Sequence, residues 1–217
     1  MPTIQQPVFT PSRAEPSIDG RRDLRAKRLF DIVIASVLLI FCLPTLLMVA
    51  VAIWIETGGP VFFTQERTGF GGRVFRILKF RSMVHSACAK PVIQAVRGDA
   101  RVTRVGAFIR RTNLDELPQL VNVLRGDMSL VGPRPHALAH DDYYGRRVGD
   151  YDRRFGVLPG MTGLAQVSGC RGETPTVAHM AARVAHDLEY VRAGDIGMDL
   201  KILVRTLLST ARDPAAF

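Results

Sequence analysis

The sequence predicts a mixed α/β, helix-dominated protein, in which a small cytoplasmic domain is carried by a re-entrant membrane helix broken at a proline. Three observations lead to this fold class. Residues 32–55 contain no charge over 24 positions, whereas about 20 apolar residues suffice to span a bilayer. Beyond this run, several segments repeat apolar residues at helical spacing and only two resemble strands. The length of 217 residues and the hydrophobic fraction of 47% suit one such domain and exclude a protein with many membrane spans.

The N-terminal residues predict a tail, a surface helix and then the membrane helix. Residues 1–20 contain four prolines and no periodic apolar pattern, which indicates a disordered tail, whereas residues 21–31 predict a short basic helix on the membrane surface. Pro44, near the centre of the apolar run, removes a backbone donor and clashes with the carbonyl of Ile40. Basic residues flank the run on both sides, whereas a single crossing concentrates them on the cytoplasmic side. A break at Leu43-Pro44 and a return to the same side would satisfy both flanks, but a proline is also tolerated in an ordinary helix that crosses once, so both paths stay open on these features.

A hairpin, a loop and four helices are expected after the membrane helix. Residues 61–63 and 74–81 predict two strands around the glycine-rich turn at 68–72. Alternation along the second strand places Lys79 and Arg81 on one face, where they could bind phosphate or equally lipid head groups. Residues 84–100 are weakly patterned and predict a mobile loop. Helical spacing follows at 102–109, at 117–124 with Gly126 as its end, at 177–191, and at 200–207, where we expect a helix lying on the membrane.

The excess of basic residues indicates an anionic partner, and the spacing of the cysteines does not suggest a zinc site. The 29 basic residues outnumber the 20 acidic ones, the net charge is +9, and 25 of the basic residues are arginine, whose planar fork binds phosphate through two hydrogen bonds. A GC-rich genome would raise the arginine content as well, so local clusters carry more information than the total. The three cysteines (Cys42, Cys88 and Cys170) lack metal-type spacing and favour a reducing compartment without a disulfide framework.

The densest cluster of reactive side chains lies between Arg110 and Gln119. Pro118 suits the first turn of a helix, and with Asp115 as the N-cap it would occupy the third helical position. Asp115 and Glu116 would then lie at a helix N-terminus close to Arg110 and Arg111, where phosphate is favoured. Carboxylates beside phosphate-binding groups suit a bridging metal ion or a carboxylate that attacks phosphorus. An acidic cap on an ordinary helix with solvated arginines explains the same residues.

Three further patterns carry weaker signals. Arg134 stands between two prolines, which reduces the entropy lost on binding phosphate, although an arginine facing water fits equally. His136 and His140 are spaced for one helix face, but no third metal ligand is suggested nearby, so structural histidines are favoured. Asp150 and Asp152 match the Asp-x-Asp pattern of many nucleotide-sugar glycosyltransferases, but no Rossmann-like half precedes them. No P-loop, GxSxG or GxGxxG motif is present.

Taken together, the motifs resemble those of the bacterial sugar transferases, the monotopic phosphoglycosyl transferases. The resemblance runs from Lys27 to about Thr210. The stretches that carry it are KRLFD (27–31), the Pro-containing membrane helix, ILKFRSM (77–83), RRTNLDELPQLVNVLRGDMSLVGPRP (110–135), LPGMTGLAQVSG (158–169), and DLEYV (187–191) with DLKI (199–202).

The resemblance implies a reaction and a site. Such enzymes transfer a sugar-1-phosphate from a nucleotide diphosphate sugar to a polyprenyl phosphate at the cytoplasmic membrane face, with Mg²⁺, and release a nucleoside monophosphate. The family dyad matches Asp115, the nucleophile, and Glu116, and both are expected to bind the metal. The residues expected to bind the diphosphate are Lys79, Arg81, Arg110, Arg111 and Arg134. The family breaks its re-entrant helix at a Ser-Pro pair, and this chain has Leu43-Pro44, so the serine hydroxyl is missing.

The expected location is the cytoplasmic face of the bacterial inner membrane. The chain is expected to divide into a tail at 1–20, a membrane-associated part at 21–56 and a catalytic domain at 57–212. Residues 169–174 and 134–137 look like the branch that transfers glucose-1-phosphate in exopolysaccharide synthesis, so UDP-glucose is favoured over UDP-galactose or an N-acetylated UDP-sugar. The other expected partners are undecaprenyl phosphate, membrane lipid and downstream glycosyltransferases, and no nucleic acid. Two other classes stay open: a membrane-attached glycosyltransferase that uses Asp150 and Asp152, and an inert basic scaffold.

Overall fold

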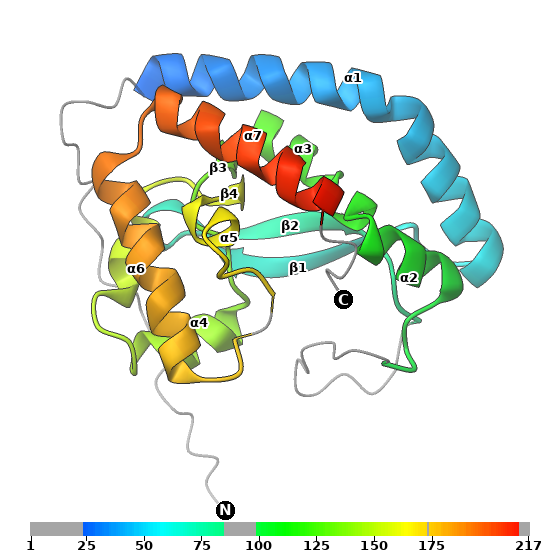
Figure 1. The fold of residues 1–217 in the computed structure, drawn as a ribbon. Helices are drawn as coiled ribbons and strands as arrows, with labels where there is room; N and C mark the ends of the chain where they lie inside the picture. The colour runs from blue at the N-terminus through cyan, green and yellow to red at the C-terminus, as the bar shows by residue number, and fades with distance from the viewer. Residues whose placement is uncertain (1–23, 85–98, 173, 213–217) are drawn as a thin grey trace, which may run out of the picture.

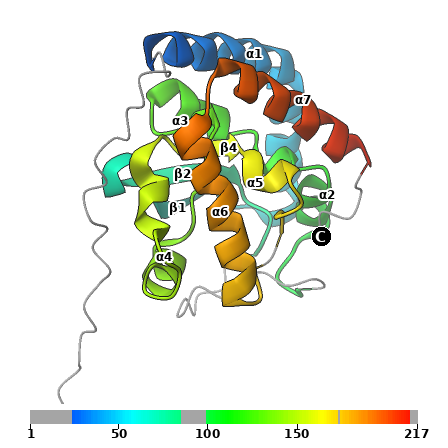
Figure 2. The same cartoon turned by 60° about the vertical axis from the view of Figure 1, so that its left-hand side comes forward.

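The computed structural model describes residues 24–84, 99–172 and 174–212 and confirms a helix-dominated α/β fold. A long helix, α1 (Leu24–Thr57), runs along one side of the molecule, and α7 (Ile196–Arg212) lies next to it in both views (Figures 1 and 2). The hairpin of β1 (Phe62–Thr68) and β2 (Val74–Phe80) lies at the centre, and α6 (Val177–Ala193) packs on another side (Figure 1). The predicted tail and nearly all of the predicted loop at 84–100 lie outside the described residues.

The expected surface helix and membrane helix form one continuous helix, α1. Its helical backbone includes Pro44, and the ribbon turns toward its C-terminal end to follow the side of the domain (Figure 1). Among the described helices it alone is long and apolar enough to cross a membrane. One side of α1 is buried against the domain through Asp31, Ala35, Val49 and Ile53. The large apolar side chains of α1 that remain exposed are Leu24, Leu29, Ile32, Val33, Val37, Leu38, Ile40, Phe41, Leu43, Leu47, Met48, Val51, Trp54 and Ile55.

A buried ionic cluster joins the start of α1 to the domain. Lys27 Nζ lies 2.9 Å from Asp31 Oδ1 and 2.9 Å from Asp199 Oδ2, and it donates to Ser129 Oγ at 2.6 Å. Tyr190 donates its hydroxyl to Asp199 Oδ1 at 2.6 Å, while Asp31 Oδ1 accepts the backbone N–H of Leu130. Because both carboxylates are buried, they are stable as charges only with such partners. The cluster therefore fixes how α1 meets the domain.

The predicted hairpin is confirmed, but its first strand is longer than expected. β1 (Phe62–Thr68) pairs antiparallel with β2 (Val74–Phe80), from Phe62 opposite Phe80 to Thr68 opposite Val74. The expected strand ended at Phe63 because the residues that follow are polar. Pairing along the whole of β2 satisfies their backbone groups, so polar side chains do not end the strand.

The helices predicted at 102–109 and 117–124 lie near their expected positions, whereas α4 (Leu138–Gly145) and α5 (Leu164–Val167) were not predicted. α2 (Arg104–Arg111) has Thr103 as its N-cap, and the Thr103 hydroxyl accepts the N–H of Gly106. α3 (Gln119–Arg125) has Gly126 as its C-cap, with φ 90°. Leu120 and Val123 of α3 join Ile77 of β2, Ala35 of α1 and Ile202 of α7 in the main hydrophobic core. This core places α3, and the turn before it, between the hairpin and the long helix.

Two short strands were not predicted. β3 (Ser129–Val131) and β4 (Gly160–Thr162) form a parallel pair, too short to give a periodic signal. A Cβ on Gly132 would lie 2.4 Å from the carbonyl oxygen of Leu158, and one on Gly160 would lie 2.1 Å from the amide nitrogen of Gly132. Only glycine permits this close backbone approach, which holds the turn that carries Arg134.

Candidate active site

Asp115 and Glu116 lie on a tight turn rather than at the start of the helix. Asn113 adopts φ 57°, and the short 3-10 helix η2 (Leu114–Glu116) follows, with N–H bonds from Glu116 to Asn113 and from Leu117 to Leu114. The N-cap position of α3 is Pro118, so the prediction of Asp115 as the N-cap was wrong. The chain turns with three-residue spacing before Pro118, and regular helical bonding starts only after it.

Glu116 is held by two cations from different parts of the chain. Lys79 Nζ of β2 donates to Glu116 Oε1 at 2.8 Å, and the Arg134 guanidinium bonds both carboxylate oxygens, with Nη1 3.0 Å from Oε2. Burial alone would raise the pKa of Glu116, but Arg134 and Lys79 hold that pKa well below its usual value. Glu116 is therefore a carboxylate at all working pH values.

Asp115 differs from its neighbour. Burial, followed by the charge of Glu116, raises the pKa of Asp115 to about 6, although Lys79, Arg110 and Arg134 act in the opposite direction. Two adjacent carboxyl groups with unequal pKa values are typical of sites in which they have different chemical roles. Asp115 is therefore the more basic of the two carboxyl groups, whereas Glu116 supplies a fixed negative charge.

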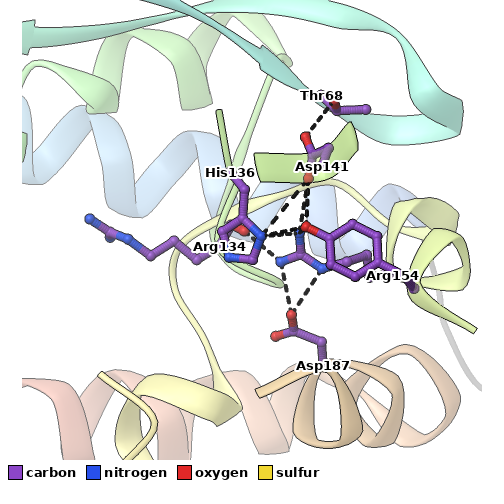
Figure 3. Close-up of polar contacts among 7 residues, drawn as sticks. Thr68, Arg134, His136, Asp141, Arg154 and Asp187 are labelled. Atoms are coloured by element: carbon purple, nitrogen blue, oxygen red, sulfur yellow. Dashed lines mark hydrogen bonds and ion pairs between the residues drawn. The ribbon is translucent and has the colours of Figure 1, made fainter. Parts of the chain in front are cut away.

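Arg134 is positioned by a buried polar network (Figure 3). The guanidinium of Arg154, 1% exposed, donates to the backbone oxygen of Arg134 at 2.6 Å, to His136 Nδ1 at 2.9 Å, and to Asp187 Oδ2 at 3.1 and 2.8 Å. The side chain of Arg134 itself extends away from this network (Figure 3). Arg154 thus fixes the backbone from which Arg134 reaches Glu116.

Tyr151 and Asp141 complete the network. The Tyr151 hydroxyl donates to Asp141 Oδ1 at 2.7 Å and lies 2.7 Å from His136 Nδ1, and Thr68 donates to Asp141 Oδ2 at 2.7 Å. His136 is buried in this network, and the ring of His140 packs edge-on against Tyr144 at a centroid distance of 6.2 Å. These contacts give both histidines a structural role, as expected, although Nε2 of His136 has no hydrogen-bond partner among the described residues.

The other residues expected to bind phosphate do not all lie near Asp115 and Glu116. Arg110 lies close enough to Asp115 to lower its pKa, whereas Arg111 is exposed and its guanidinium stacks 6.0 Å from the ring centroid of Phe108. Arg81 donates to Thr57 at the end of α1. It lines a cleft of about 550 Å³ that includes neither Asp115 nor Glu116. Lys79, Arg110 and Arg134 are therefore the three predicted cations grouped around the dyad.

The Asp-x-Asp pattern does not form a comparable site. Asp150 adopts φ 56° and pairs with Arg153 at 3.2 Å, while Tyr151, between the two aspartates, is buried in the network. No group of three or more His, Cys, Asp or Glu side chains in the described ranges is arranged to hold a metal ion.

Arg154, Asp187 and the cluster around Lys27 were not predicted from the sequence. Asp187 and Asp199 lie in motifs that carried the family resemblance, but nothing local marks them as buried partners of basic residues. Arg154 follows Arg153, which is exposed, so the sequence gives no means to tell the two apart. The Lys27–Asp31 spacing of four residues is the one signal that predicts a pair.

Comparisons with known proteins give a consistent picture. The family model described as bacterial sugar transferase matches residues 22–213. The UDP-glucose:undecaprenyl-phosphate glucose-1-phosphate transferase of Caulobacter vibrioides is 54% identical over 187 residues, which are 86% of this chain and 70% of that protein. The Escherichia coli K12 protein of the same name is 47% identical over 88% of this chain, and the chain spans only 41% of its length. The exopolysaccharide production protein PSS of Rhizobium leguminosarum is 47% identical over 86% of this chain and 96% of its own length.

Proposed function

Because the chain belongs to the bacterial sugar transferase family, we propose that it transfers glucose-1-phosphate from UDP-glucose to undecaprenyl phosphate, with release of UMP. The names of the Caulobacter and Escherichia relatives support this reaction, and the name of the Rhizobium relative supports a place in exopolysaccharide production. The observation that carries the proposal is the unequal dyad: a basic Asp115 beside a Glu116 held by Lys79 and Arg134.

The first step is attack of Asp115 on the sugar phosphate. A carboxylate oxygen of Asp115 bonds to the phosphorus next to glucose, the bond from this phosphorus to the bridging oxygen breaks, and UMP leaves with the electron pair. Attack by an anion on a diphosphate is opposed by charge repulsion. Lys79, Arg110 and Arg134 reduce this repulsion because they surround the dyad before substrate arrives.

The second step regenerates the enzyme. A phosphate oxygen of undecaprenyl phosphate attacks the same phosphorus, the bond to Asp115 breaks, and the lipid-linked diphosphate sugar is released. Two steps allow the soluble donor and the membrane-bound acceptor to use one site in turn.

The dyad fits Mg²⁺, which such a reaction is expected to need. Mg²⁺ commonly uses one or two protein carboxylates together with substrate phosphates and water, so Asp115 and Glu116 suffice as protein ligands. Burial, and then the charge of Glu116, raise the pKa of Asp115, so its carboxylate form would be stabilised by an added cation. When bound, the ion supplies positive charge to the diphosphate.

The membrane topology is part of the proposal. We infer that α1 enters the inner membrane from the cytoplasm and returns, with its exposed apolar side in lipid. Its 34 residues, the proline inside it and its ribbon turn support this path (Figure 1). α7 exposes Leu200, Val204, Leu207 and Leu208 beside α1, which supports a shared lipid-facing surface. Downstream glycosyltransferases would then receive the product at the same membrane face.

A product assay tests the reaction. Purified protein with Mg²⁺, undecaprenyl phosphate and UDP-glucose should release UMP, whereas a glycosyltransferase that uses Asp150 and Asp152 would release UDP and a scaffold would release neither. UDP-galactose and N-acetylated UDP-sugars in parallel reactions identify the donor.

The variant Asp115→Asn tests the nucleophile. It should lose UMP release by several orders of magnitude, because an amide cannot replace an attacking carboxylate. Asp150→Asn is a matched control, because Asp150 is exposed and asparagine tolerates its positive φ. Isolation of a phosphosugar adduct on Asp115 would support the step, and normal UMP release by Asp115→Asn would refute it.

A further inference from the structure

Two buried hydrogen-bond donors flank Arg134. Nε of Arg67 and Nε2 of His136 are buried, and neither has a hydrogen-bond partner among the described residues. Buried polar atoms are nearly always paired in folded proteins, so each exception needs an explanation. The reaction steps above use neither residue.

His136 presents an N–H at this unpaired atom. Its Nδ1 accepts a hydrogen bond from Arg154 Nη1 at 2.9 Å, because a guanidinium can only donate. Burial, and then the charges of Arg154 and Arg183, hold the pKa of His136 well below its usual value, so the ring is neutral. A neutral ring with an accepting Nδ1 carries its proton on Nε2. The unpaired atom is therefore a donor, as is Nε of Arg67.

Arg67 lies on the same face of the hairpin as Lys79. Arg67 pairs with Phe75 and Lys79 pairs with Phe63, so alternation places both basic residues on one face. A backbone bridge from Arg67 to Ala137 brings the end of β1 against the segment that carries Arg134 and His136. Nη2 of Arg67 donates to a neutral acceptor on its own strand, Gln65 Oε1, at 2.7 Å.

The charges around Arg67 lack a matching anion. Burial, and then the charge of Arg134, lower the pKa of Arg67 to about 10, while Asp141 and Glu116 raise it. Asp141 is already bonded by Thr68 and Tyr151, and Glu116 is bonded by Lys79 and Arg134. Arg67 and Arg134 thus form a cationic pair with spare hydrogen-bond donors.

We propose that Arg67 and His136, together with Arg134, bind the nucleotide phosphate of the sugar donor, the one that leaves as UMP. This inference rests on the proposed function. A phosphate group supplies several acceptor oxygens and negative charge at once, which matches two unpaired donors beside two guanidiniums. A sugar hydroxyl would leave the positive charge uncompensated.

The positions of the charges favour the leaving phosphate over the attacked one. Lys79 and Arg134 bond Glu116 beside Asp115, whereas Arg67 lies at the end of β1, bridged to Ala137. The largest charge effect on Arg67 comes from Arg134. Arg134 is therefore shared between the two groups. A diphosphate with its sugar phosphate at Asp115 and its nucleotide phosphate at Arg67 would place Arg134 between them.

Calorimetric titration of the purified full-length chain with UDP, UMP and uridine tests the inference. Arg67→Met should weaken UDP and UMP about tenfold or more, the loss expected for a charge-assisted hydrogen bond, and leave uridine binding unchanged. His136→Asn should weaken both nucleotides too, because its amide can replace Nδ1 as the acceptor for Arg154 but supplies nothing at Nε2. Arg76→Met is the matched control, because Arg76 lies on the opposite hairpin face with its side chain 75% exposed.

The outcomes separate the inference from the function. Unchanged UMP affinity in folded Arg67→Met, or an equal loss for uridine, overturns the inference. If Arg67→Met does not fold, Arg67→Lys replaces it and should still weaken UDP and UMP, though by less, because an ammonium keeps the charge but not the Nε donor. UMP release from UDP-glucose by the unaltered protein is measured alongside. If no UMP is released, the proposed reaction is refuted. If UMP is released but the Arg67 and His136 variants bind UMP with unchanged affinity, only the roles of Arg67 and His136 are refuted.

Discussion

Replacement of Arg154 by methionine should strongly destabilise the protein. Arg154 donates twice to Asp187 Oδ2, at 3.1 and 2.8 Å, and each side chain of the pair is 1% exposed. Removal of one partner of such a pair leaves a buried charge without compensation and costs about 3–5 kcal/mol of unfolding free energy. That loss is a large part of the 5–15 kcal/mol that typically stabilises a domain. For a chain of this size it lowers Tm by about 6–20 °C.

A double-mutant cycle isolates the pair. The variant Arg154→Met/Asp187→Leu buries no charge at this site, so it should be more stable than the sum of the two single changes predicts, by about 2 kcal/mol. Because burial raises the pKa of Asp187, the carboxyl left alone in Arg154→Met takes up a proton as the pH falls. The deficit of that variant relative to the unaltered protein should therefore be smaller at pH 5 than at pH 8.

Thermal unfolding in detergent, followed by fluorescence, measures these differences. Arg153→Met is the control, because Arg153 is adjacent in sequence but pairs with Asp150 at the surface, where ion pairs contribute about 0–1 kcal/mol. The reasoning fails if the Tm of Arg154→Met lies within about 2 °C of that control. It also fails if the cycle shows no coupling between Arg154 and Asp187.

Three further predictions concern the site and the membrane helix. Arg134→Lys should lower kcat/KM for UMP release about tenfold or more, because an ammonium cannot bond both oxygens of Glu116 as the guanidinium does. Full activity would show that the two-pronged contact of the guanidinium with Glu116 is dispensable. The first step should slow as the pH is lowered through about 6, the pKa of Asp115, because a protonated carboxyl cannot attack. A bound cation moves this inflection to lower pH. A pH–rate profile that stays flat to pH 4 would contradict the role of Asp115 as the attacking group. In cells that carry native Pro44, single cysteines at positions 15 and 66 should resist labelling from the periplasm, whereas Pro44→Leu should expose one of them. A straight helix of 24 residues is about 36 Å long, which is enough to cross the hydrocarbon core of the membrane, about 30 Å thick. Labelling of either site with Pro44 in place would refute the re-entrant path.

Local sequence patterns were sufficient for the hairpin and the longer helices, and they singled out Asp115 and Glu116. The hairpin, the helices at α2, α3, α6 and α7 and the stop at Gly126 follow from periodicity and capping, which depend on neighbouring residues. Asp115 and Glu116 stood out because two carboxylates precede a proline close to two arginines. Patterns failed where the signal was short or polar, as in β3, β4 and the second half of β1.

Only the tertiary structure decided which charged residues act together. Lys79 and Arg134 lie 37 and 18 residues from Glu116, and Arg154 lies 33 residues from Asp187. Nothing in the sequence distinguishes buried Arg154 from exposed Arg153, or the basic Asp115 from its permanently charged neighbour. Periodicity records which face of an element is apolar, whereas a pKa and an ion pair depend on burial and on charges brought from distant segments. The sequence alone therefore located the dyad, and folding made its two carboxyl groups different.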